Sequence, residues 1–264
     1  MPEYLFPEVE RVIYGKSPLV EVICQVRFPA DLRIETTPPV DFQQRIRAQF
    51  PLLIQRNRAV LSAMPPDLAK AFESVMPPSG GSTTWEFNTE DGQHTLQLVR
   101  DTLTLISRNY RRWEDFSGLF RGPFAALNEL YSPQFYTRVG LRYRDIIQRS
   151  NLGLVERPWT GLLEPHVLAE IAQPGFEART EEAFRNVLLK LPDQGAKVRL
   201  QHGFAEVEGS TEQVYLIDCD FFVERTEIAN VDGALQYFHG NAARFFRWCI
   251  SDSLHQAMEP GPVA

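Results

Sequence analysis

The sequence has few of the residue patterns that mark secreted proteins, metal sites or common catalytic sites. It contains only three cysteines, Cys24, Cys219 and Cys249, each in an apolar or alternating run. An odd number of widely spaced cysteines predicts small buried side chains rather than disulfides or metal ligands. The five histidines follow no ligand spacing, and there is no glycine-rich phosphate loop or nucleophile elbow. We therefore expect no cofactor and no catalytic residue of these types.

Long hydrophobic runs and a basic N-terminus are also missing. No apolar stretch approaches the roughly 18 residues that span a bilayer. The N-terminal sequence MPEYLFPEVERV carries acidic residues where a signal peptide has basic ones. The net charge of −7 and the pI near 5.4 disfavour general attraction to nucleic acid or to an anionic membrane, although a local basic patch is compatible with them. These features predict a cytoplasmic globular protein without a membrane segment.

The patterns that are present alternate between strands and helices. With 44% hydrophobic residues, the chain can bury a core without disulfides. Two-residue alternation predicts strands at 19–28, 83–88, 94–100, 102–109, 135–147, 183–191, 196–207 and 213–224. Helical spacing predicts helices at 38–50, 113–131 and 232–249, and shorter ones at 67–75 and 164–171. Residues 1–17 are expected to form an extended N-terminal arm, and 259–264 a frayed tail.

The two halves of the chain, 18–133 and 134–258, have the same order of elements. Each contains a strand, a helix, an irregular segment, three strands and a long aromatic helix, which indicates an internal duplication. Duplicated β-α-β-β-β-α halves can join edge to edge into one largely antiparallel sheet of about eight strands, with two long helices packed on one face. The predicted class is therefore α+β, and its layout resembles the saddle of the TATA-binding-protein-like fold.

The predicted central strand, FYTRVGLRYRDII, carries three arginines on one side. Arg138, Arg142 and Arg144 alternate there with apolar residues that point the other way. Such a row of guanidinium groups needs carboxylates or solvent opposite it. Asp218 and Asp220 are two residues apart in the later strand VYLIDCDFF, so both point to one face. We expect these two aspartates to be the partners of the arginines.

Other polar side chains are expected on the same face of the sheet: Glu21, Gln25, Arg27, Gln97, Thr102, Thr104 and Arg108. One interpretation is a salt-bridged sheet face, where cross-strand pairs contribute roughly 0.2 to 1 kcal/mol each. The other is a binding surface for a protein partner or a small anionic ligand, because guanidinium groups suit phosphate and carboxylate oxygens. In that interpretation the binding residues are Glu21, Arg27, Arg138, Arg142, Arg144, Asp218 and Asp220.

Our leading hypothesis is a non-enzymatic binding or accessory protein. The first alternative is a metal-dependent enzyme acting on a nucleotide or nucleic acid, in which Asp218 and Asp220 hold a divalent cation and Arg138 and Arg142 hold phosphate. The second is a nucleic-acid-binding protein, whose affinity would fall steeply with salt. An exposed aromatic helix face could also form a homodimer.

Polar residues near the starts of the two long helices have simpler explanations. We expect Asn109 to cap the first of these helices and Trp113 to lie in the core. His239 and Asn241 are explained by the polar surface of the second helix.

Five segments in order resemble a sporadically distributed family of uncharacterised bacterial proteins: PLVEVICQVRF, NYRRWEDF, RVGLRYRDII, YLIDCDFF and HGNAARFFRWCI. The resemblance spans Pro18 to Met258. It implies no activity, and its patchy distribution implies an accessory role in a defence or toxin-antitoxin type module. The chain departs from the family pattern at Asp145, where asparagine is common, and at Ser251, where threonine is common. The resemblance assigns motif positions to Glu21, Tyr110, Trp113, Arg138, Gly140, Arg142, Tyr143, Asp218, Asp220, Asn241 and Phe245.

Overall fold

The structure of the protein, a computed structural model, describes residues 3–56, 83–207 and 211–263. The helix expected at 67–75 lies outside these residues. The strands are β1 (Val12–Tyr14), β2 (Leu19–Arg27), β3 (Leu52–Arg56), β4 (Thr84–Asn88), β5 (His94–Val99), β6 (Thr102–Ser107), β7 (Tyr136–Ile147), β8 (Phe184–Lys190), β9 (Lys197–Glu206), β10 (Gln213–Thr226) and β11 (Pro260–Pro262). The helices are α1 (Leu32–Thr36), α2 (Val40–Ile46), α4 (Trp113–Tyr131), α5 (Pro165–Leu168), α6 (Val231–Cys249) and α7 (Asp252–Ala257).

One large antiparallel sheet organises the α+β fold. Its strand order is β3-β4-β5-β6-β2-β7-β10-β9-β8, so nine strands take the place of the expected eight or so. Strand β7 pairs with β2, the middle strand of the nine, on one side and with β10 on the other. The edge strand β3 was not predicted, because its consecutive apolar residues Leu52, Leu53 and Ile54 show no alternation. All three are exposed in the structure.

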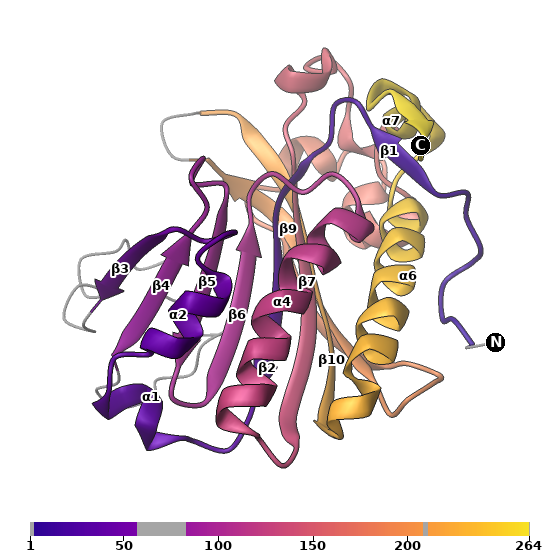
Figure 1. Ribbon diagram of the computed structural model, residues 1–264. Coiled ribbons are helices and arrows are strands. Elements are labelled where there is room, and N and C mark those ends of the chain that lie inside the picture. The colour runs from indigo at the N-terminus through magenta and orange to yellow at the C-terminus, as the bar shows by residue number, and fades with distance from the viewer. Residues whose placement is uncertain (1–2, 57–82, 208–210, 264) are drawn as a thin grey trace.

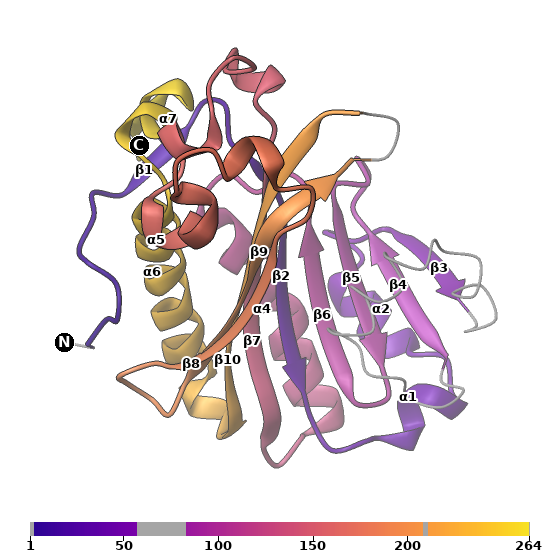
Figure 2. The same ribbon diagram turned by 180° about the vertical axis from the view of Figure 1, so that it is seen from behind.

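Helices α4 and α6 lie side by side on one face of the sheet, and α2 packs against α4 (Figure 1). Seen from behind, the sheet stands in front of α4, and most of α6 is visible beside it (Figure 2). The apolar residues of β7 and β10 that face the helices, among them Val139, Leu141 and Phe221, are fully buried against side chains such as Phe238. Each large side chain buried in this way contributes about 1.5 to 3 kcal/mol. The apolar core therefore lies between this face and the helices.

Two properties of the core agree with expectations from composition. All three cysteines are buried and free, as predicted. Among the described residues, we find no helix whose length and hydropathy would allow it to span a bilayer.

The two ends of the chain are joined, so the expectation of a frayed tail at 259–264 was wrong. Strand β11 pairs with β1 of the N-terminal arm, with Tyr14 opposite Pro260. The Tyr14 hydroxyl is also 2.8 Å from Nδ1 of His255 on α7. Nearer the N-terminus, Tyr4 lies against Gly240 of α6, where a Cβ atom would come within 2.8 Å of the tyrosine ring. These contacts hold the N-terminal arm against α6 and α7.

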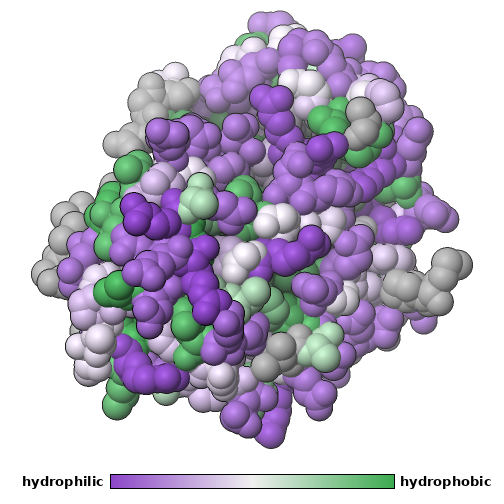
Figure 3. Space-filling model, viewed as in Figure 1, coloured by the Kyte–Doolittle hydropathy of each residue, from purple (hydrophilic) through white to green (hydrophobic). Residues whose placement is uncertain are grey.

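The face of the molecule that carries the helices is mostly hydrophilic. In Figure 3 the hydrophobic residues among those coloured form small, separate patches rather than one continuous surface. Trp248 of α6 is one of the exposed large hydrophobic residues of the described chain. A homodimer through this face therefore remains a prediction from sequence alone.

We expect Gly203→Ala to destabilise the hairpin of β8 and β9. A Cβ atom on Gly203 would lie 2.0 Å from the carbonyl oxygen of Ala183 and 2.8 Å from Cα of Phe184, so the backbone must move. Overpacking of this kind costs about 1 to 3 kcal/mol. Urea unfolding measures the loss.

Gly118→Ala is the matched control, because a Cβ placed on this glycine of α4 has no described atom within 4 Å beyond its chain neighbours and the nearby backbone of its own helix. It should stabilise the protein by up to about 1 kcal/mol. Equal effects of the two substitutions would contradict the steric explanation.

Candidate functional site

The predicted pairing of arginines and aspartates is confirmed, and its most buried member is Arg142 with Asp218. The register places Asp218 of β10 opposite Arg144 and Asp220 opposite Arg142, so this ion pair runs diagonally between the strands. Arg142 Nε and Nη2 each donate to one Asp218 oxygen at 2.6 Å. The side chains are only 7% and 5% exposed. Because two hydrogen bonds link the charges, the pair is bidentate and fixes the geometry of both groups.

A second pair, Arg138 with Asp220, lies closer to solvent. Arg138 Nη2 donates to both carboxylate oxygens at 2.8 and 2.7 Å, and the side chains are 17% and 20% exposed. Gly140 makes this arrangement possible, since a Cβ atom there would lie 2.4 Å from Nη1 of Arg138. The guanidinium also lies 4.7 Å from the centre of the Phe222 ring.

Glu21 of β2 extends the network to the other side of β7. Its carboxylate accepts a hydrogen bond from Arg144 at 3.2 Å and lies 3.7 Å from Arg108. Arg144 also approaches Asp218 at 3.4 Å. The structure therefore brings together six of the seven predicted site residues as ion pairs across three adjacent strands.

The seventh predicted residue, Arg27, joins the network through Gln25 and Arg138. Arg27 is the register partner of Arg138, so two guanidinium groups face the same side of neighbouring strands. Gln25 Oε1 accepts a hydrogen bond from Arg27 at 2.7 Å and one from Arg138 at 3.5 Å. Burial, and then the charge of Arg138, lowers the pKa of Arg27. The charges of Asp101 and Asp220 act on Arg27 in the opposite direction and raise its pKa.

The arrangement of the aspartates is that of ion-pair partners. Asp218 and Asp220 each have both carboxylate oxygens engaged by a guanidinium group, and a cation would have to displace Arg142 or Arg138. Within 3–56, 83–207 and 211–263, no three His, Cys, Asp or Glu side chains are grouped so that they could hold a metal.

A cavity of about 580 Å³ on the opposite face of the sheet was not predicted. It lies beneath the N-terminal arm and is walled by β1, α6 and the segment before α4. Asp145 of β7 lines this cavity, is only 6% exposed, and forms no hydrogen bond or ion pair with any described residue. Burial, together with the charge of Asp218, raises the pKa of Asp145 to about 8. Its carboxyl group is therefore mainly protonated at neutral pH.

The sequence did carry a signal for Asp145. Val139, Leu141, Tyr143, Asp145 and Ile147 are every second residue of one strand, so the alternation that places four of them in the core places the aspartate there as well. An acidic residue on the apolar face of a strand therefore indicates a buried carboxyl group.

Aromatic side chains surround Asp145 in the cavity. Tyr110, Tyr143 and His239 line it, and Tyr143 Oη is 3.1 Å from His239 Nδ1. His239 stacks on Trp113 with ring centroids 4.9 Å apart, and burial lowers its pKa to about 4, so it is neutral at pH 7. The wall is therefore aromatic and uncharged.

Three expectations about polar residues at the long helices were wrong. His239 is half-buried and lines the cavity, and Asn241 is fully buried and donates to the carbonyl oxygen of Tyr237 at 2.9 Å. Helix-surface polarity therefore explains neither residue. The N-cap of α4 is Arg112, not Asn109. Trp113 lies in the core, as predicted.

Arginines lie around the open side of the cavity, and most of them are paired. Arg11 donates two hydrogen bonds, of 2.8 and 2.9 Å, to Glu114 at the start of α4, and these bonds lower the pKa of Glu114 to about 2. This ion pair links the N-terminal arm to the start of α4. Arg111 is exposed and forms no hydrogen bond or ion pair with a described residue.

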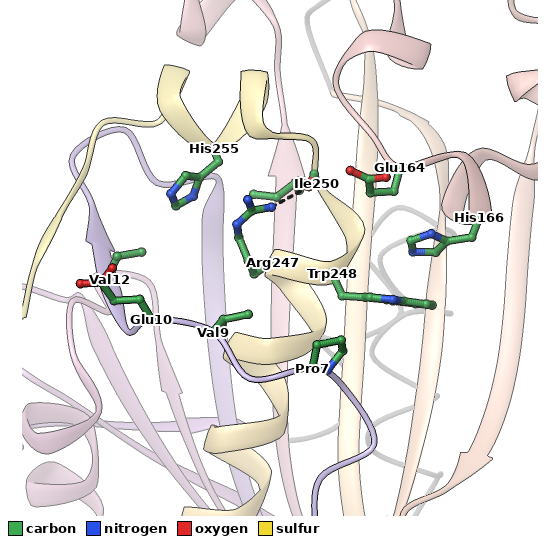
Figure 4. A pocket seen from close by; sticks show the side chains of 10 residues that line it. All are labelled: Pro7, Val9, Glu10, Val12, Glu164, His166, Arg247, Trp248, Ile250 and His255. Carbon is green, nitrogen blue, oxygen red and sulfur yellow. Dashed lines mark hydrogen bonds between the residues drawn. The ribbon is translucent and has the colours of Figure 1, made fainter.

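A second hollow lies on the other side of the same arm, at the end of α6. Figure 4 shows Glu164 and His166 on one side of it, residues of the arm on the other, and Arg247 between them. Arg247 donates to the carbonyl oxygen of Ile250 at 3.0 Å and pairs with Asp252. The His166 and Trp248 rings are 3.8 Å apart. The hollow has a volume of about 580 Å³, and the cation at its centre is already paired.

Comparison with known proteins adds no assignment, because no protein-family model matches the chain and no curated protein matches it.

Proposed function

We propose that this protein is a non-enzymatic cytoplasmic binding protein that recognises an acidic group of a protein partner through the arginine and aspartate face of its sheet. An accessory role in a defence or toxin-antitoxin type module fits this activity. The observation that carries the proposal is the side-by-side placement of Arg27 and Arg138. Like charges directly opposite each other on neighbouring strands are destabilising, and an acidic ligand would add to the compensation that Asp220 already gives Arg138.

The edge strand β8 supports contact with a second protein. Phe184, Val187 and Leu188 of this strand are exposed, and β8 is the last strand in the order of the sheet. Natural proteins usually protect sheet edges with charge, proline or covering segments. Exposed apolar side chains on an edge strand favour a partner that adds to it.

Arg27→Glu is expected to abolish partner binding without loss of stability. Glutamate at this position would face Arg138 and form a cross-strand ion pair worth roughly 0.2 to 1 kcal/mol, while repelling an acidic partner. We would purify the tagged full-length protein from its own host, identify bound proteins by native mass spectrometry, and expect at least about a tenfold loss of partner with the variant.

Arg45→Glu is the matched control, because Arg45 pairs with Glu129 on the helix side of the molecule. It should retain the partner. A partner that stays bound to Arg27→Glu would contradict the proposal, as would a lowered melting temperature of that variant. Co-purified nucleic acid that dissociates steeply with salt would instead support the nucleic-acid-binding alternative.

We also infer that the chain arose by internal duplication. The proposal is supported by the strand order, in which β2 and β7 lie together at the centre and β6 and β10, the last strands of the two halves, flank them. A long helix, α4 or α6, follows each of these last strands. Such an arrangement relates the halves by an approximate two-fold axis, as in the TATA-binding-protein-like fold.

Membership in the sporadically distributed bacterial family is likewise our proposal. It is supported by the clustering of motif positions in space, since Arg138, Arg142, Asp218, Asp220 and Glu21 form one network. Sequences that share all five motifs would provide the test, because they should keep an acidic partner for each of these arginines.

A further inference from the structure

The cavity beneath the N-terminal arm has the properties of a ligand site rather than of a packing defect. Its volume of about 580 Å³ lies within the range of about 300 to 1,000 Å³ that is typical of small-molecule sites. A buried polar group normally has a hydrogen-bond partner, and the Asp145 carboxyl has none among the described residues. A packing defect would be lined by apolar side chains, not by a carboxyl group.

We propose that this cavity binds a small anion with a planar, hydrogen-bonding head group, of the class of nucleoside monophosphates. The head lies against Asp145 and the aromatic wall, and the phosphate lies at the arginines around the open side.

The hydrogen-bonding groups of Asp145 indicate which ligand head group would fit. In its protonated form a carboxyl group offers one donor and one acceptor, which matches the paired donor and acceptor of a nucleobase edge. Arg247 of α6 also lines the cavity and is paired with Asp252. The uncharged titratable groups of the lining include Tyr14 on β1, Tyr143 on β7, Cys219 on β10 and His239 on α6. Burial raises the pKa values of Tyr14 and Cys219 and lowers that of His239, so all are uncharged at pH 7.

The shape and polarity of the wall favour a flat ring. Tyr110 and Tyr143 meet edge to face with ring centroids 5.8 Å apart, and Phe246 lines the cavity from α6. Aromatic side chains stack on the faces of nucleobases with about 1 to 3 kcal/mol per base. An aliphatic anion would make no stacking contact with these aromatic residues.

The charges at the open side favour a phosphate group. Arg111 has no partner among the described residues, and Arg108 approaches Glu21 only to 3.7 Å. Both belong to the lining of the cavity. Guanidinium groups bind phosphate oxygens in a bidentate manner, so these two arginines are suited to hold the anion.

Most of this site lies on the other side of β7 from the partner-binding surface of the proposed function, and Arg108 reaches both, because it lines the cavity and lies 3.7 Å from Glu21. Asp145 and Tyr143 face the helices, whereas Arg142 and Arg144 point to the other side of β7. Loss of one activity therefore does not imply loss of the other.

The test measures binding of AMP, GMP, CMP and UMP to the full-length protein at pH 7 by thermal shift and calorimetry. Inorganic phosphate, the four nucleosides and spermidine serve as comparison probes. At least one nucleotide at millimolar concentration should raise the melting temperature by roughly 2 to 5 °C, because a ligand that binds only the folded state stabilises it. The corresponding nucleoside and phosphate alone should bind more weakly.

Four variants locate the site. Asp145→Leu should abolish binding, while Asp145→Asn should keep affinity within about threefold, since asparagine also donates and accepts. Ala243→Phe fills the cavity from an exposed position of α6 and should block binding even if Asp145→Leu misfolds. Arg111→Ala should weaken nucleotide binding by about tenfold and leave nucleoside binding unchanged. Arg121→Ala, on the exposed side of α4, is the control.

The proposal is overturned if none of the four nucleotides changes the melting temperature. It is also overturned if the shift persists in both Asp145→Leu and Ala243→Phe, which would place the ligand elsewhere. Stabilisation by spermidine that disappears in Asp145→Asn would show that the aspartate acts as a carboxylate toward a cation. Retention of nucleotide binding by Arg27→Glu would separate this site from the partner surface.

Discussion

Replacing Asp218 by alanine is expected to lower the free energy of unfolding by about 3 to 5 kcal/mol. The reason is that Arg142 is buried and would lose both of its 2.6 Å hydrogen bonds to this carboxylate. A guanidinium group keeps its charge at any ordinary pH, so it cannot escape the penalty by deprotonation. Urea unfolding at pH 7 measures the loss.

Two comparison variants separate the cost of an unpaired charge from the value of the pair. Asp220→Ala should cost on the order of 1 kcal/mol, because Arg138 is more exposed and water can solvate it. The double variant Arg142→Met with Asp218→Leu removes both charges and fills the space, so its stability should lie within about 1 kcal/mol of the wild type. A loss below about 1 kcal/mol for Asp218→Ala would mean that water reaches Arg142 in the folded protein.

The double variant also decides the role of the buried pair. If it folds and still binds its partner, Arg142 and Asp218 are part of the scaffold, and recognition belongs to Arg27 and Arg138. If it folds but no longer binds, the buried pair positions the binding residues as well as the strands.

Sequence periodicity predicted the antiparallel sheet and the pairing across it because both follow from local alternation. Asp218 and Asp220 had to share a face, and the three arginines of β7 needed carboxylates opposite them. The exact partners were not predictable, because Arg138 and Arg142 reach diagonally past their register neighbours, whereas Arg144 contacts its own neighbours, Glu21 and Asp218. Gly140 permits one such diagonal contact by leaving room for the Arg138 side chain.

The parts that were missed depend on contacts between distant segments. Strands β1 and β11 have three residues each, and β11 is Pro260–Pro262, a composition that local rules assign to a loop. They form a sheet only because the two ends of the chain meet beside α6. The cavity was missed for the same reason, since its walls come from the arm, β7, β10 and α6.

Replacing Asp145 by asparagine is expected to stabilise the unliganded protein, and increasingly so as the pH rises. The pKa of Asp145 is about 8 in the folded protein and 3.8 for an ordinary aspartate, so the folded state holds the proton more tightly between these values. The stability contributed by this group is fully present below about pH 4 and is lost as the pH rises through about 8. Asparagine has no proton to lose.

The measurement compares the two proteins by urea unfolding at pH 5, 7 and 9. Because each pKa unit corresponds to about 1.4 kcal/mol, the advantage of Asp145→Asn should grow by roughly 3 to 4 kcal/mol between pH 5 and 9. Other groups, including His239 and His202 with pKa values near 4, titrate equally in both proteins, and their effects cancel in the difference. A difference that does not change with pH would mean that Asp145 is ionised throughout and has a partner. A difference that grows as expected would mean that Asp145 holds its proton in the folded protein and destabilises the fold when it loses it.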